Sequence, residues 1–253
     1  MTKISSFEEA MPCWVDVMVA TNEEHQATMA FLSALFDWTW QIGGPEMASY
    51  SLAMSQDLPV FGLGISEGTH GAANTYFSTS NIDDAISRAN EDGASTLVPR
   101  MDVMDIGAMA VLIDPVGATF GLWQPATFHG FGVMYELNTP GWFDEASADP
   151  ERAAEFYTKW SGHQLTSPGD EMRVIANGEQ WYASLTKVDG EPAQWKPIYI
   201  VDSLQRAREV VTRHGGAILV EEMPVPGSAL TVFTEPVNGT IMTVMRGGEH
   251  PDQ

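Results

Sequence analysis

A carboxylate inside an apolar segment is the first residue of this chain that could do chemistry. Asp16 lies in CWVDVMVA, residues 13–20, whose alternation predicts a half-buried strand. By the strand period of two, Trp14 and Met18 share the face of Asp16. Desolvation raises the pKa of a carboxyl group, so Asp16 is a candidate general base near neutral pH, and Trp14 is a candidate ligand-binding residue.

Other catalytic motifs are missing from the sequence. The six histidines include no His-x-His and no pair four residues apart, and there is no phosphate-binding loop, dinucleotide fingerprint or zinc-ligand spacing. Cys13 is the single cysteine, which excludes an internal disulfide, and its apolar strand indicates a buried hydrophobe rather than a nucleophile.

Composition restricts the partners. The chain has 253 residues, with 12 basic and 34 acidic side chains and a net charge of -22. Such a field repels phosphate backbones and anionic lipids, so neither nucleic acid nor a membrane surface is an expected partner. No stretch has the length and apolarity of a membrane span or of a signal peptide. These features predict an acidic, soluble, cytoplasmic protein.

The segments expected to form the strands and helices around Asp16 occur twice in the sequence. IDDAISRANEDGAS from Ile82 matches LQRAREVVTRHGGA from Leu204, and VLIDPVGATFGLW from Val111 matches VFTEPVNGTIMTV from Val232. A repeat of about 120 residues indicates two copies of one domain. We expect a first domain over 1–126, a linker over 127–132 and a second domain over 133–250. If residues of the two copies are paired 120 positions apart, Glu136 corresponds to Asp16. Residues 139–149, which contain GWFDEASA, are then expected to be an inserted connection in the second copy.

Periodicity predicts the elements of each copy. In the first copy we expect a strand at 13–20, a helix at 24–36 and strands near 48–54 and 59–65. A strand at 73–80, a helix at 82–91 and strands at 108–113 and 119–124 follow. These elements give strand–helix–strand–strand twice in the copy, and we interpret each copy as two strand–helix–strand–strand–strand units.

The two βαβββ units per copy, the DPVGATFGLWQP ending and the FDW after the first helix resemble the vicinal oxygen chelate superfamily. That superfamily includes glyoxalase I, bleomycin-resistance proteins and extradiol dioxygenases, and the chain more closely resembles its two-domain actinobacterial glyoxalase-like members. The resemblance spans nearly the whole chain. It implies an α+β fold of two tandem glyoxalase-like domains, each a curled mixed sheet of paired βαβββ units around a cleft. It does not fix the reaction, since this fold hosts several.

The resemblance also implies where a metal ion would bind. Metal-using members place His, Glu or Gln ligands on the first and last strands of the units. The matching positions are Asp16, Asn74 and Gln124 in the first copy, and Glu136, Lys196 and Met245 or Arg246 in the second. Amides are weak ligands, a lysine ammonium has no lone pair, and Met is too soft for Mg, Mn or Zn. We therefore expect no metal ion and no other cofactor.

Without a metal, these positions form polar clusters in an apolar cleft. Asp16 is the expected base, with Asn74 and Gln124 orienting a substrate carbonyl. Glu136 and Lys196 form either an acid–base pair or a structural salt bridge. Eight Trp residues indicate an aromatic lining, and Tyr76 and Trp195 join Trp14 as candidate ligand-binding residues. Because the first copy carries neutral amides, we expect recognition to be concentrated there.

Three classes of function remain open. The first is metal-independent acid/base catalysis on a small carbonyl-bearing or aromatic metabolite. The second is sequestration of a small molecule without catalysis, as in bleomycin-resistance proteins. The third is a metal-dependent glyoxalase or dioxygenase, which the ligand inventory disfavours. In each case the partner is a small organic molecule, and the chain is a monomer or a homodimer.

Overall fold

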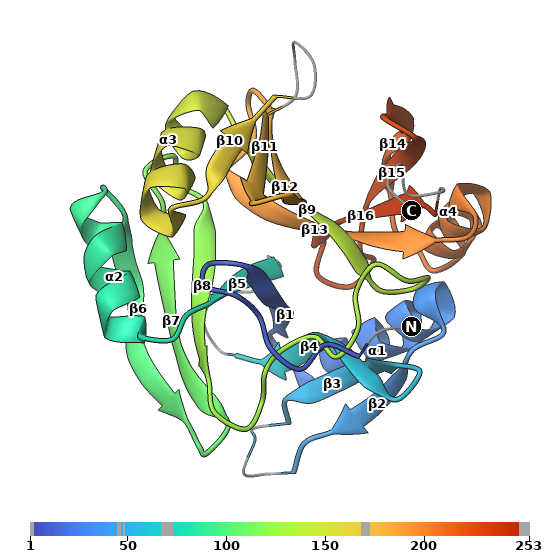
Figure 1. Cartoon of the computed structure of the whole chain (residues 1–253). Coiled ribbons are helices and arrows are strands. Elements are labelled where there is room, and N and C mark those ends of the chain that lie inside the picture. Colours follow the sequence, from blue (N-terminus) through green and yellow to red (C-terminus); the bar gives the residue numbers. More distant parts are fainter. Residues whose placement is uncertain (1–2, 45–46, 48, 67–72, 168–172, 248–253) are drawn as a thin grey trace.

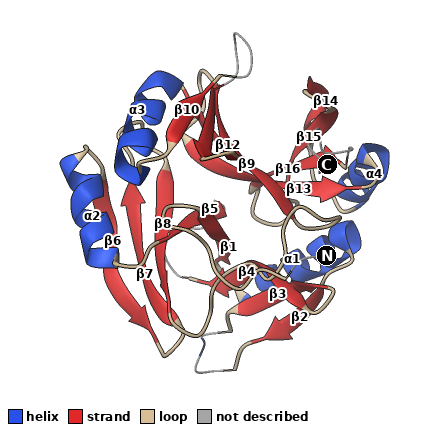
Figure 2. Ribbon diagram, in the orientation of Figure 1, coloured by secondary structure: helices blue, strands red, loops and turns tan. Residues whose placement is uncertain are grey.

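The part of the chain that the structure describes forms two eight-stranded mixed sheets and four α-helices (Figure 2). A computed structural model describes residues 3–44, 47, 49–66, 73–167 and 173–247. The expected α+β fold of two tandem glyoxalase-like domains is confirmed. The predicted end of the second domain at residue 250 lies outside the described residues.

The first sheet is built from two βαβββ units. They comprise β1 (Pro12–Val19), α1 (Asn22–Phe36), β2 (Thr39–Ile42), β3 (Ser51–Ser55), β4 (Leu58–Ile65), β5 (Ala73–Ser78), α2 (Ile82–Glu91), β6 (Ser95–Val103), β7 (Gly107–Ile113) and β8 (Thr119–Pro125). The strand order is β2-β3-β4-β1-β5-β8-β7-β6, so the first strands of the two units lie side by side at the centre.

The second sheet repeats this arrangement. Its elements are β9 (Pro140–Ser147), α3 (Pro150–Ser161), β10 (Gln164–Thr166), β11 (Arg173–Asn177), β12 (Gln180–Lys187), β13 (Gln194–Val201), α4 (Leu204–Arg213), β14 (Ile218–Val225), β15 (Ser228–Thr234) and β16 (Ile241–Arg246). The order β10-β11-β12-β9-β13-β16-β15-β14 matches that of the first sheet strand for strand.

All four helices begin with the same local device. The side chain of the residue before each helix accepts a hydrogen bond from a backbone amide of the first turn: Thr21, Asn81, Asp149 and Ser203. Such caps satisfy amides that have no partner inside the helix. A short polar side chain therefore fixes the residue at which each of these helices begins.

The helices cover one face of each sheet, which we call the helix face; the opposite face is the inner face. The two helix faces meet between the domains, with α2 beside α3 and α1 beside α4 (Figure 1). Phe77 on β5 packs against Trp195 on β13, with ring centroids 5.1 Å apart. The inner faces therefore point away from the contact between the domains.

Two equivalent turns join the domains. Asp114, after β7, accepts a hydrogen bond from the Tyr157 hydroxyl of α3 at 2.8 Å. Glu235, after β15, accepts one from the Thr28 hydroxyl of α1 at 3.2 Å. Each carboxylate also accepts backbone amides of its own turn, so one side chain orders the turn and contacts the other domain.

The placement of Glu136 on the opening strand of the second domain is wrong. Tyr135 and Asn138 have φ angles of 64° and 62°, in the left-handed region, so the segment turns instead of extending. The first strand is β9, which contains residues 141–147 of the GWFDEASA segment, so the predicted inserted connection over 139–149 is wrong. The residue that corresponds to Asp16 is Asp144.

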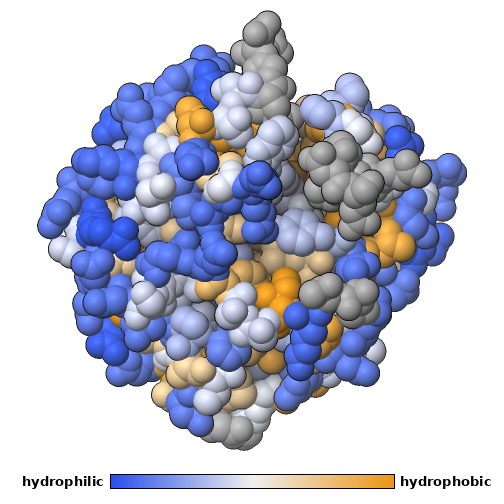
Figure 3. Space-filling view, in the orientation of Figure 1, coloured by the Kyte–Doolittle hydropathy of each residue, from blue (hydrophilic) through white to orange (hydrophobic). Residues whose placement is uncertain are grey.

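Hydrophilic residues cover most of the face shown in Figure 3, as the net charge of -22 leads one to expect. Among the described residues no helix is both long and apolar enough to cross a membrane.

Candidate functional site

Asp16 lies at the centre of the first sheet, on its inner face. Its strand β1 runs between β4 and β5, and Asp16 is in register with Gly62 on one side and Asn74 on the other. Trp14 is in register with Tyr76. Four of the predicted residues, Trp14, Asp16, Asn74 and Tyr76, therefore share one surface, and three of them are at most 5% exposed: Trp14, Asp16 and Tyr76.

A chain of hydrogen bonds leads to one oxygen of Asp16. The Trp14 indole N–H donates to the Tyr50 hydroxyl at 2.9 Å. Because an indole N–H only donates, Tyr50 must direct its own proton elsewhere, and it donates to Oδ2 of Asp16 at 3.1 Å. Tyr76 donates to the same oxygen at 3.2 Å, whereas Oδ1 receives only Asn74, at 3.4 Å. Oδ1 is thus the less engaged oxygen.

Two glycines make room for the tyrosines on neighbouring strands. A Cβ atom on Gly62 would lie 1.9 Å from the Tyr50 hydroxyl oxygen, and one on Gly121 would lie 2.1 Å from Cδ1 of Tyr76. Only glycine permits such close approach of a ring to the strand backbone. The sheet is therefore shaped around the Tyr50–Asp16–Tyr76 cluster.

Burial dominates the electrostatics of this cluster. Desolvation raises the pKa of Asp16 to about 6, although hydrogen bonds from Tyr50, Asn74 and Tyr76 act in the opposite direction. Burial, and the charge of Asp16, also hold the pKa values of Tyr50 and Tyr76 well above the ordinary one. The hydroxyls thus remain donors at neutral pH, while the carboxyl group can both take and release a proton.

The second domain contains the same device with shorter side chains. The Trp142 indole N–H donates to the Ser184 hydroxyl at 2.9 Å, and Ser184 donates to Oδ1 of Asp144 at 2.5 Å. Thr186 donates to that oxygen as well, at 2.6 Å. Both domains therefore contain the same series of hydrogen bonds, from an indole N–H to a hydroxyl and from that hydroxyl to a carboxylate. We call this series the relay.

Lys196 distinguishes the second cluster from the first. It is in register with Asp144, at the position that Asn74 has opposite Asp16. Its ammonium lies 3.7 Å from a carboxylate oxygen of Glu191. Burial raises the pKa of Asp144, while hydrogen bonds from Ser184 and Thr186 and the charge of Lys196 lower it. The partner that the register gives Lys196 is Asp144, not the predicted Glu136.

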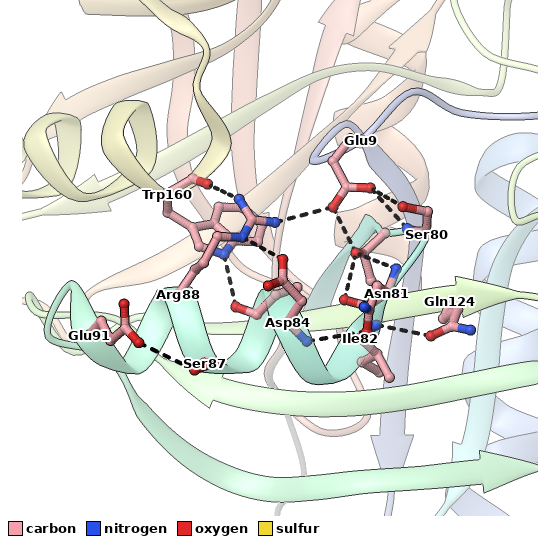
Figure 4. A network of polar contacts seen from close by, with 12 residues as sticks. Glu9, Ser80, Asn81, Ile82, Asp84, Ser87, Arg88, Glu91, Gln124 and Trp160 are labelled. Atoms are coloured by element: carbon pink, nitrogen blue, oxygen red, sulfur yellow. Dashed lines mark hydrogen bonds and ion pairs between the residues drawn. The ribbon is translucent and has the colours of Figure 1, made fainter.

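Gln124 does not join Asp16. On β8, Gly121 is in register with Tyr76 and Leu122 with Phe77, so Gln124 shares the parity of Leu122 and the helix face. Figure 4 shows its side chain at the start of α2, where Oε1 accepts a hydrogen bond from the Ile82 amide at 2.9 Å. It stabilises the first turn of a helix, and its predicted place in the cleft is wrong.

Trp195 is also on the helix face. Its side chain is 1% exposed and its indole N–H donates to the Tyr157 hydroxyl at 2.7 Å. Phe77 packs against it from the first domain. Trp195 therefore belongs to the core between the domains, and its predicted contact with a ligand is wrong.

Sequence reasoning missed Tyr50, Asp144, Ser184 and Thr186. A signal for Asp144 was present, because Trp14-Val15-Asp16 and Trp142-Phe143-Asp144 share the pattern Trp-x-Asp. Each aspartate also precedes a helix-capping residue, Thr21 or Asp149, by five positions. Both comparisons give an offset of 128 instead of 120. Nothing as local points to Tyr50, which reaches Asp16 from 34 positions away.

The inner faces do not offer the donors that a transition metal requires. The central strands supply one carboxylate in each domain, Asp16 or Asp144, opposite an amide or an ammonium group. Across the described ranges, no three His, Cys, Asp or Glu side chains gather closely enough to hold an ion. A single carboxylate with weak or cationic neighbours does not fit Zn, Mn or Fe.

Curated relatives match the chain over most of its length. The protein named "Putative glyoxylase CFP32" in Mycobacterium tuberculosis is 26% identical over 262 residues, covering 97% of this chain and 98% of the relative. The "Anthracycline biosynthesis protein DauV" of Streptomyces sp. (strain C5) is 26% identical over 204 residues, covering 74% of this chain and 72% of the relative. No family model matches the chain.

Solved structures share the fold at low sequence identity. A Mn(II)-bound glyoxalase from Novosphingobium aromaticivorans has a TM-score of 0.67 at 14% identity, covering 95% of this chain and 83% of that one. The 2,3-dioxygenase LapB from Pseudomonas sp. KL28 has a TM-score of 0.66 at 12% identity, covering 97% and 96%. At such identities the likeness concerns the fold and not the reaction.

Proposed function

We propose that this chain is a glyoxalase-like protein, since a relative named as a glyoxylase matches it over nearly its whole length and its two-domain fold is shared with a glyoxalase and a dioxygenase of the vicinal oxygen chelate superfamily. From that premise we propose that its first domain binds a small carbonyl-bearing or aromatic metabolite and transfers a proton on it through Asp16, without a metal ion. The observation that carries the proposal is a carboxyl group 4% exposed, with two tyrosine donors on Oδ2, one longer amide contact on Oδ1 and a pKa of about 6.

The hydrogen-bond geometry suggests how the residues divide the work. Oδ2 of Asp16 is held by Tyr50 and Tyr76, so Oδ1 is the oxygen that takes a proton from the carbon next to a substrate carbonyl. The C–H bond breaks, its electron pair moves to the carbonyl oxygen, and an enolate forms. Protonated Asp16 is a poorer acceptor, which frees a tyrosine hydroxyl to donate to the enolate oxygen.

Trp14 contributes in two ways. Its N–H fixes the direction in which the Tyr50 hydroxyl donates, and its ring is packed edge-on against Phe128, with centroids 4.9 Å apart. An aromatic surface beside the carboxylate favours a flat, apolar substrate over an ionic one.

Deuterium exchange tests this proposal without knowledge of the natural substrate. Acetophenone, 2-indanone and cyclohexanone are incubated in D2O with the wild type, Asp16→Asn and Asp144→Asn, and the α protons are followed by NMR. We expect exchange above the buffer rate with the wild type and with Asp144→Asn, but not with Asp16→Asn. Equal rates for all three proteins would remove Asp16 from the role of base.

Sequestration without catalysis is the second candidate, and one observation favours it. Trp14, Tyr50 and Tyr76 already satisfy one another and Asp16, as they would in a site that only encloses a ligand. A binder would show ligand-dependent melting with an aromatic ketone panel, because a ligand stabilises the state that binds it. Raised melting temperatures without deuterium exchange would favour sequestration over proton transfer.

A further inference from the structure

Glu145 is a carboxyl group buried at the contact between the domains. It lies on the helix face of β9, in register with Leu185 and Trp195, and it is 0% exposed. The Ser147 hydroxyl donates to Oε2 at 3.1 Å, whereas Oε1 has no hydrogen-bond partner among the described residues. The corresponding residue of the first domain, 128 positions earlier, is Val17. An acid thus occupies a place where the duplicated fold uses a hydrocarbon.

The surroundings of Glu145 join the two domains. Asp114, from the turn after β7, binds the Tyr157 hydroxyl, and Trp195 donates to the same hydroxyl. Two further bonds to Asp114 come from the Val116 and Ala118 amides. Burial raises the pKa of Asp114, and these donors, with Tyr157, act in the opposite direction by favouring its ionised form.

Four ionisable groups act on Glu145 or share its neighbourhood. Asp114 and Asp144 repel its negative form, Lys196 attracts it, and Tyr157 on α3 interacts with it. The ammonium of Lys196 is on the other face of the sheet and has Glu191 as its ion-pair partner. The helix face therefore offers Glu145 one hydroxyl donor and a neighbouring carboxylate.

An ionised carboxylate is costly to bury without donors for both oxygens, whereas the neutral acid is tolerated. We propose that Glu145 is a proton-operated lock between the domains: the neutral acid permits the Asp114–Tyr157–Trp195 contact to close, and ionisation loosens it. The loss of one proton places a second negative charge beside Asp114 in the aromatic core. This inference does not rest on the proposed function, because Glu145, Asp114 and Tyr157 are outside the inner face.

The direction of the pH effect follows from the two states of the protein. Burial, and then the charge of Asp114, raise the pKa of Glu145 from 4.5 to about 8. Between these values the folded chain keeps a proton that the unfolded chain releases. The contribution to stability is complete below about 4.5 and is lost as the pH rises through about 8.

Ionisation of Glu145 would also affect the packing of β5. Phe77 stacks with Tyr157 at a centroid distance of 6.1 Å and packs edge-on against Trp195 at 5.1 Å. Its neighbour Tyr76 is on the inner face of the same strand. Loosening the lock therefore frees the helix-face packing of the strand that carries Tyr76.

Thermal melting as a function of pH tests the lock. Between about pH 6 and pH 9.5 we expect the melting temperature of the wild type to fall by about 5 °C or more. Glu145→Gln, which mimics the neutral acid, should lose this dependence and melt above the wild type at the alkaline end. Asp114→Asn should move the transition to lower pH. Glu191→Gln, which removes a half-exposed carboxylate near Lys196, is the matched control and should behave as the wild type.

A second measurement reports on docking itself. Amide hydrogen exchange in β9, β13 and α3 should accelerate at alkaline pH in the wild type, beyond the intrinsic effect of pH, and not in Glu145→Gln. If Glu145→Gln does not fold, infrared spectroscopy of the wild type must show the C=O stretch of a protonated carboxylic acid at neutral pH, lost near pH 8. A wild type with flat melting, a Glu145→Gln variant with the wild-type slope, or the absence of that band would overturn the lock.

Discussion

Asp16 and Asp144 have the same place in the two domains and receive hydrogen bonds through the same kind of relay, yet they differ in depth and in charge. Asp16 is buried beneath two tyrosine hydroxyls and faces an amide. Asp144 is half-buried, binds two short hydroxyls and faces Lys196. Duplication has kept the Trp–hydroxyl–Asp arrangement while the fourth partner has changed from neutral to cationic.

That change separates two kinds of chemistry. Burial is the largest influence in both clusters and raises the pKa of each aspartate, but in the second domain the charge of Lys196 also acts on Asp144 and lowers its pKa. Asp16 faces an amide instead of a cation, and burial raises its pKa to about 6. This difference is why we propose proton transfer for the first domain and not for the second, where Lys196 disfavours the neutral acid of Asp144.

The largest expected difference between the domains is in catalysis. Asp16→Asn should lower α-proton exchange by about 10²- to 10⁴-fold, the usual contribution of a general base. Asp144→Asn should change it by less than about threefold. Rates from NMR in D2O, with circular dichroism to verify folding, check both. A larger loss in Asp144→Asn would transfer the site to the second domain.

The pH dependence of stability is the next largest effect. The pKa of Asp16 is raised from 3.8 to about 6, so the folded state holds a proton that the unfolded state releases. The contribution of Asp16 to the free energy of unfolding is complete below about pH 3.8 and is lost as the pH rises through about 6. The total is up to about 3 kcal/mol. Urea unfolding of the wild type and Asp16→Asn at pH values from about 4 to 7 measures this difference. Parallel curves would contradict it.

Removal of the relay hydroxyls should have smaller and unequal consequences. Tyr50→Phe deletes a donor to Asp16, so we expect a further rise in the pKa of Asp16 and a loss of about 1 kcal/mol of stability. The rate of α-proton exchange should then reach its maximum at a higher pH than in the wild type. Ser184→Ala is the matched change in the second domain and should affect stability alone. An unchanged pH–rate profile in Tyr50→Phe would show that the relay does not act on Asp16.

Gln124→Ala should have the smallest effect. Loss of the acceptor for the Ile82 amide leaves the first turn of α2 less well capped, which costs about 0.5–1 kcal/mol. Ligand binding and exchange should remain as in the wild type, since Gln124 is on the helix face. Calorimetric melting and ligand titration of the same variant check the two statements. A loss of binding would place Gln124 on the inner face after all.

The fold was predictable because its information is repeated and local. Helical spacing predicts α2 at its observed residues, and the DPVG turn gives the β7–β8 connection. β2 and β6 were not among the predicted strands, since both are largely exposed and lack the alternation of a half-buried strand. Edge strands are defined by their partners more than by their own side chains.

The site was predictable only in part. Trp14, Asp16, Asn74 and Tyr76 follow from the period of two on neighbouring strands. Tyr50 does not, because it precedes β3 and reaches Asp16 across β4, over Gly62. Gln124 and Trp195 failed because each is one residue away from an inner-face position, and a shift of one residue reverses the face.

The most direct test of the central claim is a titration of the Asp16 side chain by carboxyl carbon NMR, with Asp16→Asn used to assign the signal. A buried base poised for proton transfer should titrate with a midpoint near 6. A midpoint near 4, the ordinary value of an aspartate, would mean that Asp16 is solvated and ionised like a surface carboxylate. In that case the first domain would lose its claim to acid/base chemistry.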